Sequence, residues 1–116
     1  HDFLMALFDG HGDEGHIVSH YAATYIGEIL GGHLQRRDSS ITDALSKTIL
    51  QLDQTIPQNR GSGSTAIVIY RNQNDLYIAN VGDSFAFLAE YDTQTATSTI
   101  LHHTKPHKPA DPEEKA

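Results

Sequence analysis

Apolar residues follow a helical spacing in one part of the 116-residue chain and strand-like runs elsewhere. Residues 3–8 (FLMALF) form an unbroken apolar run that ends at Asp9-Gly10, which predicts a buried strand. From residue 17 to residue 30, apolar pairs recur every four positions. This spacing predicts an amphipathic helix that breaks or ends at Gly31-Gly32. The acidic pair Asp13-Glu14 fits the first turn of this helix, where negative charge interacts favourably with the helix dipole.

A second helix is predicted over residues 41–56. Ser40, followed by Asp43 three residues later, resembles a capping box at its start. Pro57 cannot continue a helix and is expected to end it. The apolar residues that share one face of this helix are Ile41, Leu45, Ile49, Leu52 and Ile56.

The second half of the chain is rich in β-branched and aromatic residues, which predicts strands. The connections are short, with turn residues at 72–75 and at 82–84, and short connections favour an antiparallel meander. The predicted strands cover residues 64–70, 76–81, 85–91 and, more polar than the others, 95–102.

The strand at 64–70 carries apolar side chains on both faces. Ile67 and Ile69 alternate with Val68 and Tyr70, so neither face is polar. An antiparallel sheet usually leaves one face in water, so this pattern predicts a sheet covered on both sides. Two helices cover one side, and the other side needs a second sheet or another chain. We therefore expect an α+β fold of antiparallel sheets with two flanking helices.

Composition narrows the partners of the chain. The formal net charge is −7, which repels nucleic acid and anionic membranes, so neither is expected as a partner. No apolar run approaches the ~18 residues that span a bilayer. The chain has no cysteine, which excludes disulfides and thiol catalysis and fits a reducing compartment. We expect an intracellular protein, cytoplasmic or nuclear, that forms one domain.

Two strand ends carry a carboxylate next to glycine. In Phe8-Asp9-Gly10-His11-Gly12, an acid, a close-lying carbonyl and an imidazole follow the first strand. Oxygen groups of this kind suit hard cations such as Mg²⁺, although Asp-Gly is equally typical of a simple turn. Asp83 in Gly82-Asp83-Ser84 repeats the arrangement, and by itself it indicates a hairpin turn.

Histidines offer a weaker metal hypothesis. His16 and His20 are four residues apart on the first helix, a spacing that can bind a transition metal but that also fits the polar face of an amphipathic helix. His102, His103 and His107 lie in a polar region and are expected in solvent. Gly61 to Ser64 lacks the lysine of a phosphate-binding P-loop and is predicted to be a loop.

The chain carries four short motifs in this order: 8–12 (FDGHG), 63–66 (GSTA), 76–84 (LYIANVGDS) and 107–109 (HKP). Taken together, they resemble the motifs of the metal-dependent Ser/Thr protein phosphatases of the 2C type. The resemblance implies two antiparallel sheets packed together with helices outside, an α/β/β/α sandwich. It also implies that residues 1–116 are the N-terminal portion of one catalytic domain that is truncated at both ends. Residues 105–116 are then a loop and the start of a helix cut short.

The resemblance assigns roles to individual residues. Asp9 resembles the carboxylate that bridges two Mn²⁺ or Mg²⁺ ions, and Gly10 resembles the residue whose carbonyl completes one metal site. His11 resembles the general acid that protonates the leaving alkoxide, and Asp83 resembles a ligand of a third, weaker ion. Paired cations suit phosphoester hydrolysis because they acidify a water molecule and neutralise phosphoryl charge. The implied substrate is a phosphoserine or phosphothreonine protein.

The chain also departs from the family pattern. Asp13 stands where the family usually has glycine, and Phe85 stands where it usually has arginine. An upstream acidic ligand and a phosphate-binding arginine are expected before residue 1, and two further aspartates after residue 116. Two alternatives to a phosphatase portion therefore stay open. One is a pseudophosphatase that keeps the fold without catalysis, and the other is a module that forms a homodimer through the uncovered sheet.

Overall fold

The computed structural model describes residues 2–36, 40–56 and 61–105. Helices and antiparallel strands are both present, so the predicted α+β class is confirmed. The helices are α1 (Gly15–Leu34) and α2 (Ile41–Thr55). The strands are β1 (Phe3–Leu7), β2 (Gly10–His11), β3 (Gly63–Ser64), β4 (Ala66–Asn72), β5 (Asp75–Val81), β6 (Phe87–Asp92) and β7 (Thr97–His103).

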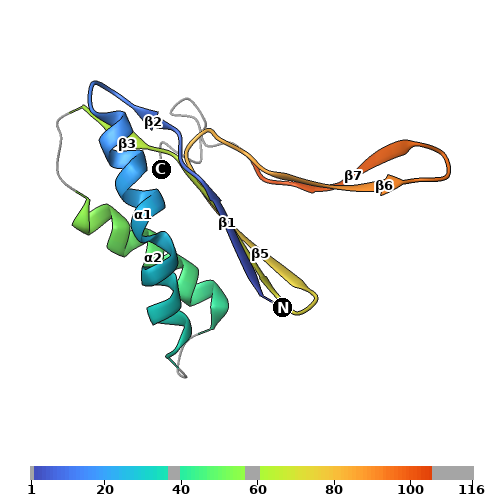
Figure 1. The fold of residues 1–116 in the computed structure, drawn as a ribbon, viewed down its shortest axis with the longest axis horizontal. Helices are drawn as coiled ribbons and strands as arrows, with labels where there is room; N and C mark the ends of the chain where they lie inside the picture. Colours follow the sequence, from blue (N-terminus) through green and yellow to red (C-terminus); the bar gives the residue numbers. More distant parts are fainter. Residues whose placement is uncertain (1, 37–39, 57–60, 106–116) are drawn as a thin grey trace.

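A three-stranded antiparallel sheet with the order β1-β4-β5 forms the centre of the fold. Leu4 pairs with Tyr70, and Tyr70 pairs with Tyr77, so alternate residues of the three strands share one face. Both helices lie against that face (Figure 1). The predicted arrangement, in which two helices cover one side of the sheet, is confirmed.

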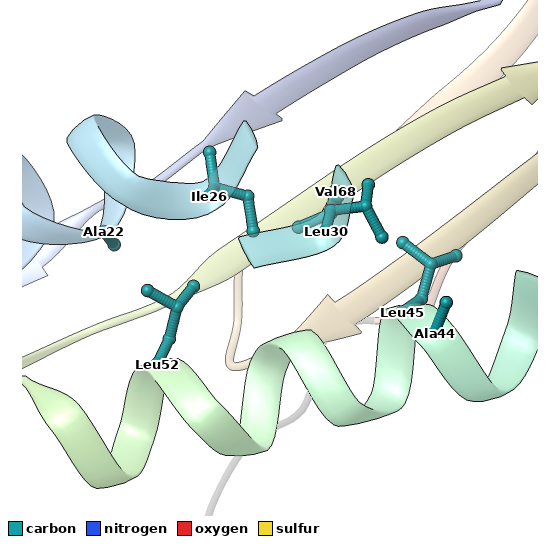
Figure 2. Packing of buried hydrophobic residues seen from close by; sticks show 7 residues of the cluster. All are labelled: Ala22, Ile26, Leu30, Ala44, Leu45, Leu52 and Val68. Atoms are coloured by element: carbon teal, nitrogen blue, oxygen red, sulfur yellow. The ribbon is translucent and has the colours of Figure 1, made fainter. Parts of the chain in front are cut away.

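Leucine, isoleucine, valine and alanine side chains from α1, α2 and β4 form the core between helices and sheet. Figure 2 shows Leu30 of α1 and Val68 of β4 beside Leu45 of α2. Leu30 is 1% exposed and Val68 is fully buried, so the centre of this cluster excludes water. Its members are Ala22, Ile26, Leu30, Ala44, Leu45, Leu52 and Val68.

The first helix is longer than the sequence predicts. It continues through Gly31-Gly32 to Leu34, so the expected end at the glycine pair is wrong. Each glycine disfavours a helix by only about 1 kcal/mol, whereas Leu30 and Leu34 on either side pack onto the core. Burial of these flanking leucines outweighs the low helix propensity of the glycines.

The start of α1 also differs from the prediction. No acidic residue lies in its first turn, because the helix begins at Gly15 and Glu14 is the residue before it. The backbone N–H of Glu14 donates to the Ser62 hydroxyl at 2.9 Å, so a distant residue satisfies it. For α2 the Ser40 half of the predicted capping box is confirmed, since the Ser40 hydroxyl accepts from the Asp43 N–H at 3.1 Å. Pro57 lies outside the described residues.

Strands β6 and β7 pair with each other and not with the central sheet, so the single predicted meander is wrong. The hairpin projects away from the helices and the sheet (Figure 1). The backbone of Ala86 is hydrogen-bonded to Thr104, at 2.8 Å through the Thr104 hydroxyl and at 2.9 Å through its N–H. These bonds extend the β6–β7 pairing toward residue 86, and β6 itself begins at Phe87 rather than at residue 85.

The second face of the central sheet has no helix against it among the described residues. Its apolar side chains on β1 are well exposed, with Met5 at 54% and Leu7 at 63%, whereas Ile67 of the central strand is 4% exposed. Among the described residues only the helix side of the sheet is covered, so the predicted cover on its second side stays a prediction. In the described ranges, neither helix is long and apolar enough to cross a membrane.

Candidate active site

The motif segments around residues 9, 65 and 83 meet at one end of the central sheet, and Thr65 joins them. The Asp9 N–H donates to the Thr65 hydroxyl at 3.1 Å, and the Thr65 N–H donates to the Asp9 carbonyl at 3.0 Å. The Thr65 and Ser84 hydroxyls are hydrogen-bonded at 2.8 Å. Thr65 is only 9% exposed, so these bonds form away from bulk water.

Strand pairing places Asp9 directly opposite Thr65. Leu7 pairs with Ile67 in the ladder before this point, and Gly10 pairs with Ser64 in the ladder after it. In a regular hydrogen-bonded pair, the Asp9 N–H donates to the facing backbone carbonyl. Here it donates to the Thr65 side chain, and the Thr65 carbonyl accepts from the Ser64 hydroxyl at 2.7 Å. This exchange interrupts the ladder at Asp9.

Close backbone packing holds the segment after Asp9 against the start of α1. A Cβ atom at Gly10 would overlap the carbonyl oxygen of Gly15 and lie 3.1 Å from the Ser19 hydroxyl. Gly12 has a positive φ of 85° and packs against Ser62 in the same way. Glycine is therefore required at both positions, and it allows strand end, loop and helix start to pack without side chains between them.

Asp9 and Gly10 do not form the turn that Asp-Gly favours. Gly10 begins strand β2, and the chain reverses after it, near Gly12. Asp9 is exposed, and its carboxylate has no hydrogen-bond or ion-pair partner among the residues that the structure describes. The backbone of Asp9 is thus held through both its N–H and its carbonyl, while its carboxylate is open to a ligand from solvent.

His11 lies at the edge of a cavity between the helices and the end of the sheet. The cavity has a volume of ≈ 550 Å³ and is lined by Leu52 and Asp53 of α2 as well as by His11 and Thr65. The His11 ring packs against Gly63, where a Cβ atom would approach its Nε2 to 2.9 Å. The absence of a side chain at Gly63 therefore leaves room for the imidazole.

Asp83 is exposed in the link between β5 and β6. The two strands do not pair, so the hairpin turn expected at residues 82–84 is wrong. Gly82 has a positive φ of 99°, and a Cβ atom there would lie 2.8 Å from the Thr65 methyl carbon. Both neighbours of Asp83 therefore contact Thr65, which holds this loop next to the Asp9 segment.

Metal donors are present by type. Asp9 and Asp83 supply carboxylates and Gly10 supplies a carbonyl, the hard oxygen donors that Mg²⁺ and Mn²⁺ take. Within residues 2–36, 40–56 and 61–105, no three His, Asp or Glu side chains are close enough to hold an ion. His16 and His20 are exposed on α1, and His102 and His103 are exposed on β7. His107 lies outside the described residues.

Thr65 and Ser62 have structural roles that the sequence reasoning missed. The loop predicted over residues 61–64 contains strand β3, and Ser62 satisfies the start of α1. A signal for these roles was present in the sequence. Both residues lie in a run of glycine and hydroxyl residues at 61–65, and a second glycine-rich segment occurs at 10–12. Small residues and hydroxyls concentrate where backbones pack closely and regular ladders are interrupted.

Sequence comparison extends these observations beyond the single chain. The family model of protein phosphatase 2C matches residues 1–116. The probable protein phosphatase 2C 61 of Arabidopsis thaliana is 28% identical over 120 residues, covering 95% of the chain and 37% of the plant protein. The integrin-linked kinase-associated serine/threonine phosphatase 2C of Bos taurus is 31% identical over 123 residues, covering 96% of the chain and 33% of the bovine protein.

A relative with a different name also matches. The adenylate cyclase of Podospora anserina is 30% identical over 142 residues, covering 97% of the chain but 6% of the fungal protein. The chain spans about a third of the length of the two phosphatases above. Because the family model matches the chain from residue 1 to residue 116, the chain belongs to the protein phosphatase 2C family.

Proposed function

We propose that the chain is the N-terminal portion of one catalytic domain of a protein serine/threonine phosphatase. The proposed reaction is hydrolysis of phosphoserine and phosphothreonine in proteins by a water molecule activated by Mn²⁺ or Mg²⁺. Family membership and the names of the phosphatase relatives support the activity. The absence of cysteine agrees with an intracellular site of action, and the charge of −7 disfavours a nucleic-acid substrate.

The single observation that carries the proposal is the convergence of the Asp9 and Asp83 segments on Thr65. In this proposal Asp9 and the Gly10 carbonyl bind the paired cations, and Asp83 binds a third. The cations supply an acidified water molecule and positive charge for the phosphoryl oxygens. The protein orients these ligands, because the Asp9 backbone is held on both sides and its carboxylate is exposed.

His11 is the proposed proton donor to the serine or threonine oxygen that leaves. Its imidazole is exposed and lies beside the cavity at the sheet end, two residues from Asp9. Histidine is the side chain that most often donates or accepts a proton in general acid–base catalysis. Gly63 provides the space in which the ring lies.

The test is Mn²⁺-dependent hydrolysis of a phosphothreonine peptide by the full-length protein. We expect Asp9→Ala and chelation each to abolish activity. Asp75→Ala is the matched control. Asp75 is also an exposed aspartate, but it lies at the start of β5, at the end of the sheet away from Asp9 and Asp83. Unchanged activity in Asp9→Ala would remove the basis of the proposal.

A leaving-group comparison tests the role of His11. Loss of a general acid slows the release of a poor leaving group such as an alkoxide, typically by ~10²- to 10⁴-fold, and affects p-nitrophenolate far less. We expect His11→Gln to slow phosphothreonine hydrolysis much more than p-nitrophenyl phosphate hydrolysis. His16→Gln, an exposed histidine on α1, should alter neither rate. Equal slowing of both substrates by His11→Gln contradicts the assignment.

The uncovered sheet face favours a second candidate function, self-association without catalysis. Phe3, Met5, Leu7 and Leu76 are all more than a third exposed on this sheet. Exposed apolar side chains gathered on one sheet face are typical of a face that packs against another sheet or another chain. Sedimentation velocity of the full-length protein distinguishes the candidates. A dimer that Met5→Lys dissociates supports self-association, and a monomer at all concentrations excludes it.

A further inference from the structure

We propose that the Thr65 hydroxyl is a positioning group that fixes Asp9 for cation binding and couples it to the Asp83 loop. This inference rests on the proposed function, in which both carboxylates bind cations. Thr65 itself is buried and contacts neither cation nor substrate in this scheme. Its contribution is the position of the backbone from which the Asp9 carboxylate projects.

The hydroxyl takes the place of a backbone carbonyl in the strand ladder. The Asp9 N–H donates to the Thr65 Oγ1 at 3.1 Å, although Asp9 and Thr65 face each other in continuous register. A hydroxyl oxygen accepts two hydrogen bonds and donates one, so Thr65 bonds Asp9 and Ser84 at the same time.

The two branches of the Thr65 side chain have separate tasks. The hydroxyl bonds Asp9 and Ser84, whereas the methyl group packs against the Cα of Gly82, where an added Cβ would lie 2.8 Å away. Valine keeps the shape of threonine and lacks the hydroxyl. Serine keeps the hydroxyl and lacks the methyl group. The pair of substitutions therefore separates positioning of Asp9 from packing.

Loss of the hydroxyl has two local outcomes, and both move Asp9. Either the Asp9 N–H loses its acceptor, or it pairs with the Thr65 carbonyl that now accepts from the Ser64 hydroxyl. The second outcome regularises the ladder and changes the direction of the Asp9 side chain. Groups that support a metal ligand in this manner typically change metal affinity by ~10- to 100-fold when they are removed.

The experiment combines two measurements on the full-length protein: Mn²⁺ affinity by calorimetry, and hydrogen exchange of the Asp9 amide by NMR. We expect Thr65→Val to weaken Mn²⁺ binding by ~10- to 100-fold. The Asp9 amide should lose its protection if its N–H is left without an acceptor, and it should stay protected with a shifted resonance if its N–H pairs with the Thr65 carbonyl. We expect Thr65→Ser to retain both the affinity and the protection, even though the lost methyl group lowers its melting temperature. Protection and the amide resonance report which group accepts from the Asp9 N–H, and neither depends on any phosphatase activity.

Three results would overturn the inference. Thr65→Val with unchanged affinity and protection shows that the hydroxyl does not position Asp9. Thr65→Ser with losses as large as those of Thr65→Val shows that packing, not the hydroxyl, matters. Asp9→Ala with unchanged Mn²⁺ affinity rejects the proposed function itself, and with it a cation-positioning role for Thr65.

Ser84→Ala keeps the inference testable if Thr65→Val does not fold. It removes the bond between the two hydroxyls and leaves the bond from the Asp9 N–H to Thr65 in place. We expect an intact Asp9 amide protection and a loss of Mn²⁺ affinity smaller than that of Asp9→Ala. An unchanged affinity in Ser84→Ala would overturn the coupling between the Asp9 segment and the Asp83 loop.

Discussion

The central sheet and the β6–β7 hairpin are both antiparallel and both rich in apolar residues, yet they differ in what covers them. In the central sheet, Val68 is fully buried beneath α1 and α2. In the hairpin, Phe87, Tyr91 and Ile100 are 60%, 60% and 62% exposed. The same kind of residue pattern thus stabilises one region through burial and leaves the other dependent on backbone pairing.

This difference indicates where the free energy of folding resides. Burial of a leucine or valine side chain contributes about 1.5–3 kcal/mol, whereas an isolated two-stranded hairpin is marginal in water. Stability of the described chain therefore comes from the layer of helices on the sheet. The site segments belong to this stable region, because Thr65 and Asp9 lie at its end.

A leucine-to-alanine pair gives the largest test of the comparison. Leu30 is 1% exposed in the core and Leu101 is 56% exposed in the hairpin. We expect Leu30→Ala to lower the free energy of unfolding by about 2–5 kcal/mol, because it leaves a cavity. Leu101→Ala should change it by less than about 0.5 kcal/mol. Urea denaturation measures both, and equal losses would show that the hairpin is packed in solution.

A glycine-to-alanine pair locates the boundary between the two regions. At Gly82, the positive φ and the nearby Thr65 make an alanine strained, and we expect a loss of about 1–3 kcal/mol. At Gly31, within α1, no atom lies within 4 Å of an added Cβ. Gly31→Ala should therefore stabilise the protein by about 0.5–1 kcal/mol. Thermal melts check both signs, and a neutral Gly82→Ala would place the loop outside the packed region.

Tyr70 gives the smallest effect, at alkaline pH. Burial within the sheet raises the pKa of the Tyr70 phenol above its usual 10.0, and the hydrogen bond to Asp2 and the Asp2 charge add to the increase. The folded state favours the protonated phenol, so Tyr70 contributes to the free energy of unfolding in full below pH 10. This contribution is lost as pH rises through the raised pKa. The free energy of unfolding, measured from pH 9 to pH 12, should decrease with pH, and this decrease should be smaller in Tyr70→Phe. An identical decline in both proteins contradicts it.

The sequence predicts local elements well where hydrophobic period and capping residues agree. The spacing from Ile41 to Leu52 and the Ser40 cap locate α2 correctly, and the strands around Val68 and Ile78 are found. The period of two also predicts correctly that one face of the sheet packs against the helices. These features depend on residues close in sequence, which is why a single chain reveals them.

Pairing between distant segments is what the sequence alone does not specify. Gly31-Gly32 looks like a helix end because the contacts that retain the helix come from α2 and the sheet. The sequence predicts β6 as a continuation of the meander, because its actual pairing joins residues far apart in the chain. Ala86 and Thr104, which bond at its start, are 18 residues apart. The resemblance identifies Asp9 and Asp83 as candidates. Only the fold reveals that Thr65 joins their segments.

Paramagnetic broadening by Mn²⁺ tests most directly the central claim, that the Asp9 and Asp83 segments belong to one cation-binding centre. The full-length protein, labelled with ¹⁵N, is titrated with substoichiometric Mn²⁺ while its amide resonances are followed. We predict that the amides of Asp9, Gly10 and Asp83 broaden first and together, and that Mg²⁺ in excess restores them. Broadening confined to the exposed histidines of α1 or β7, with the Asp9 and Asp83 amides unaffected, would contradict the account.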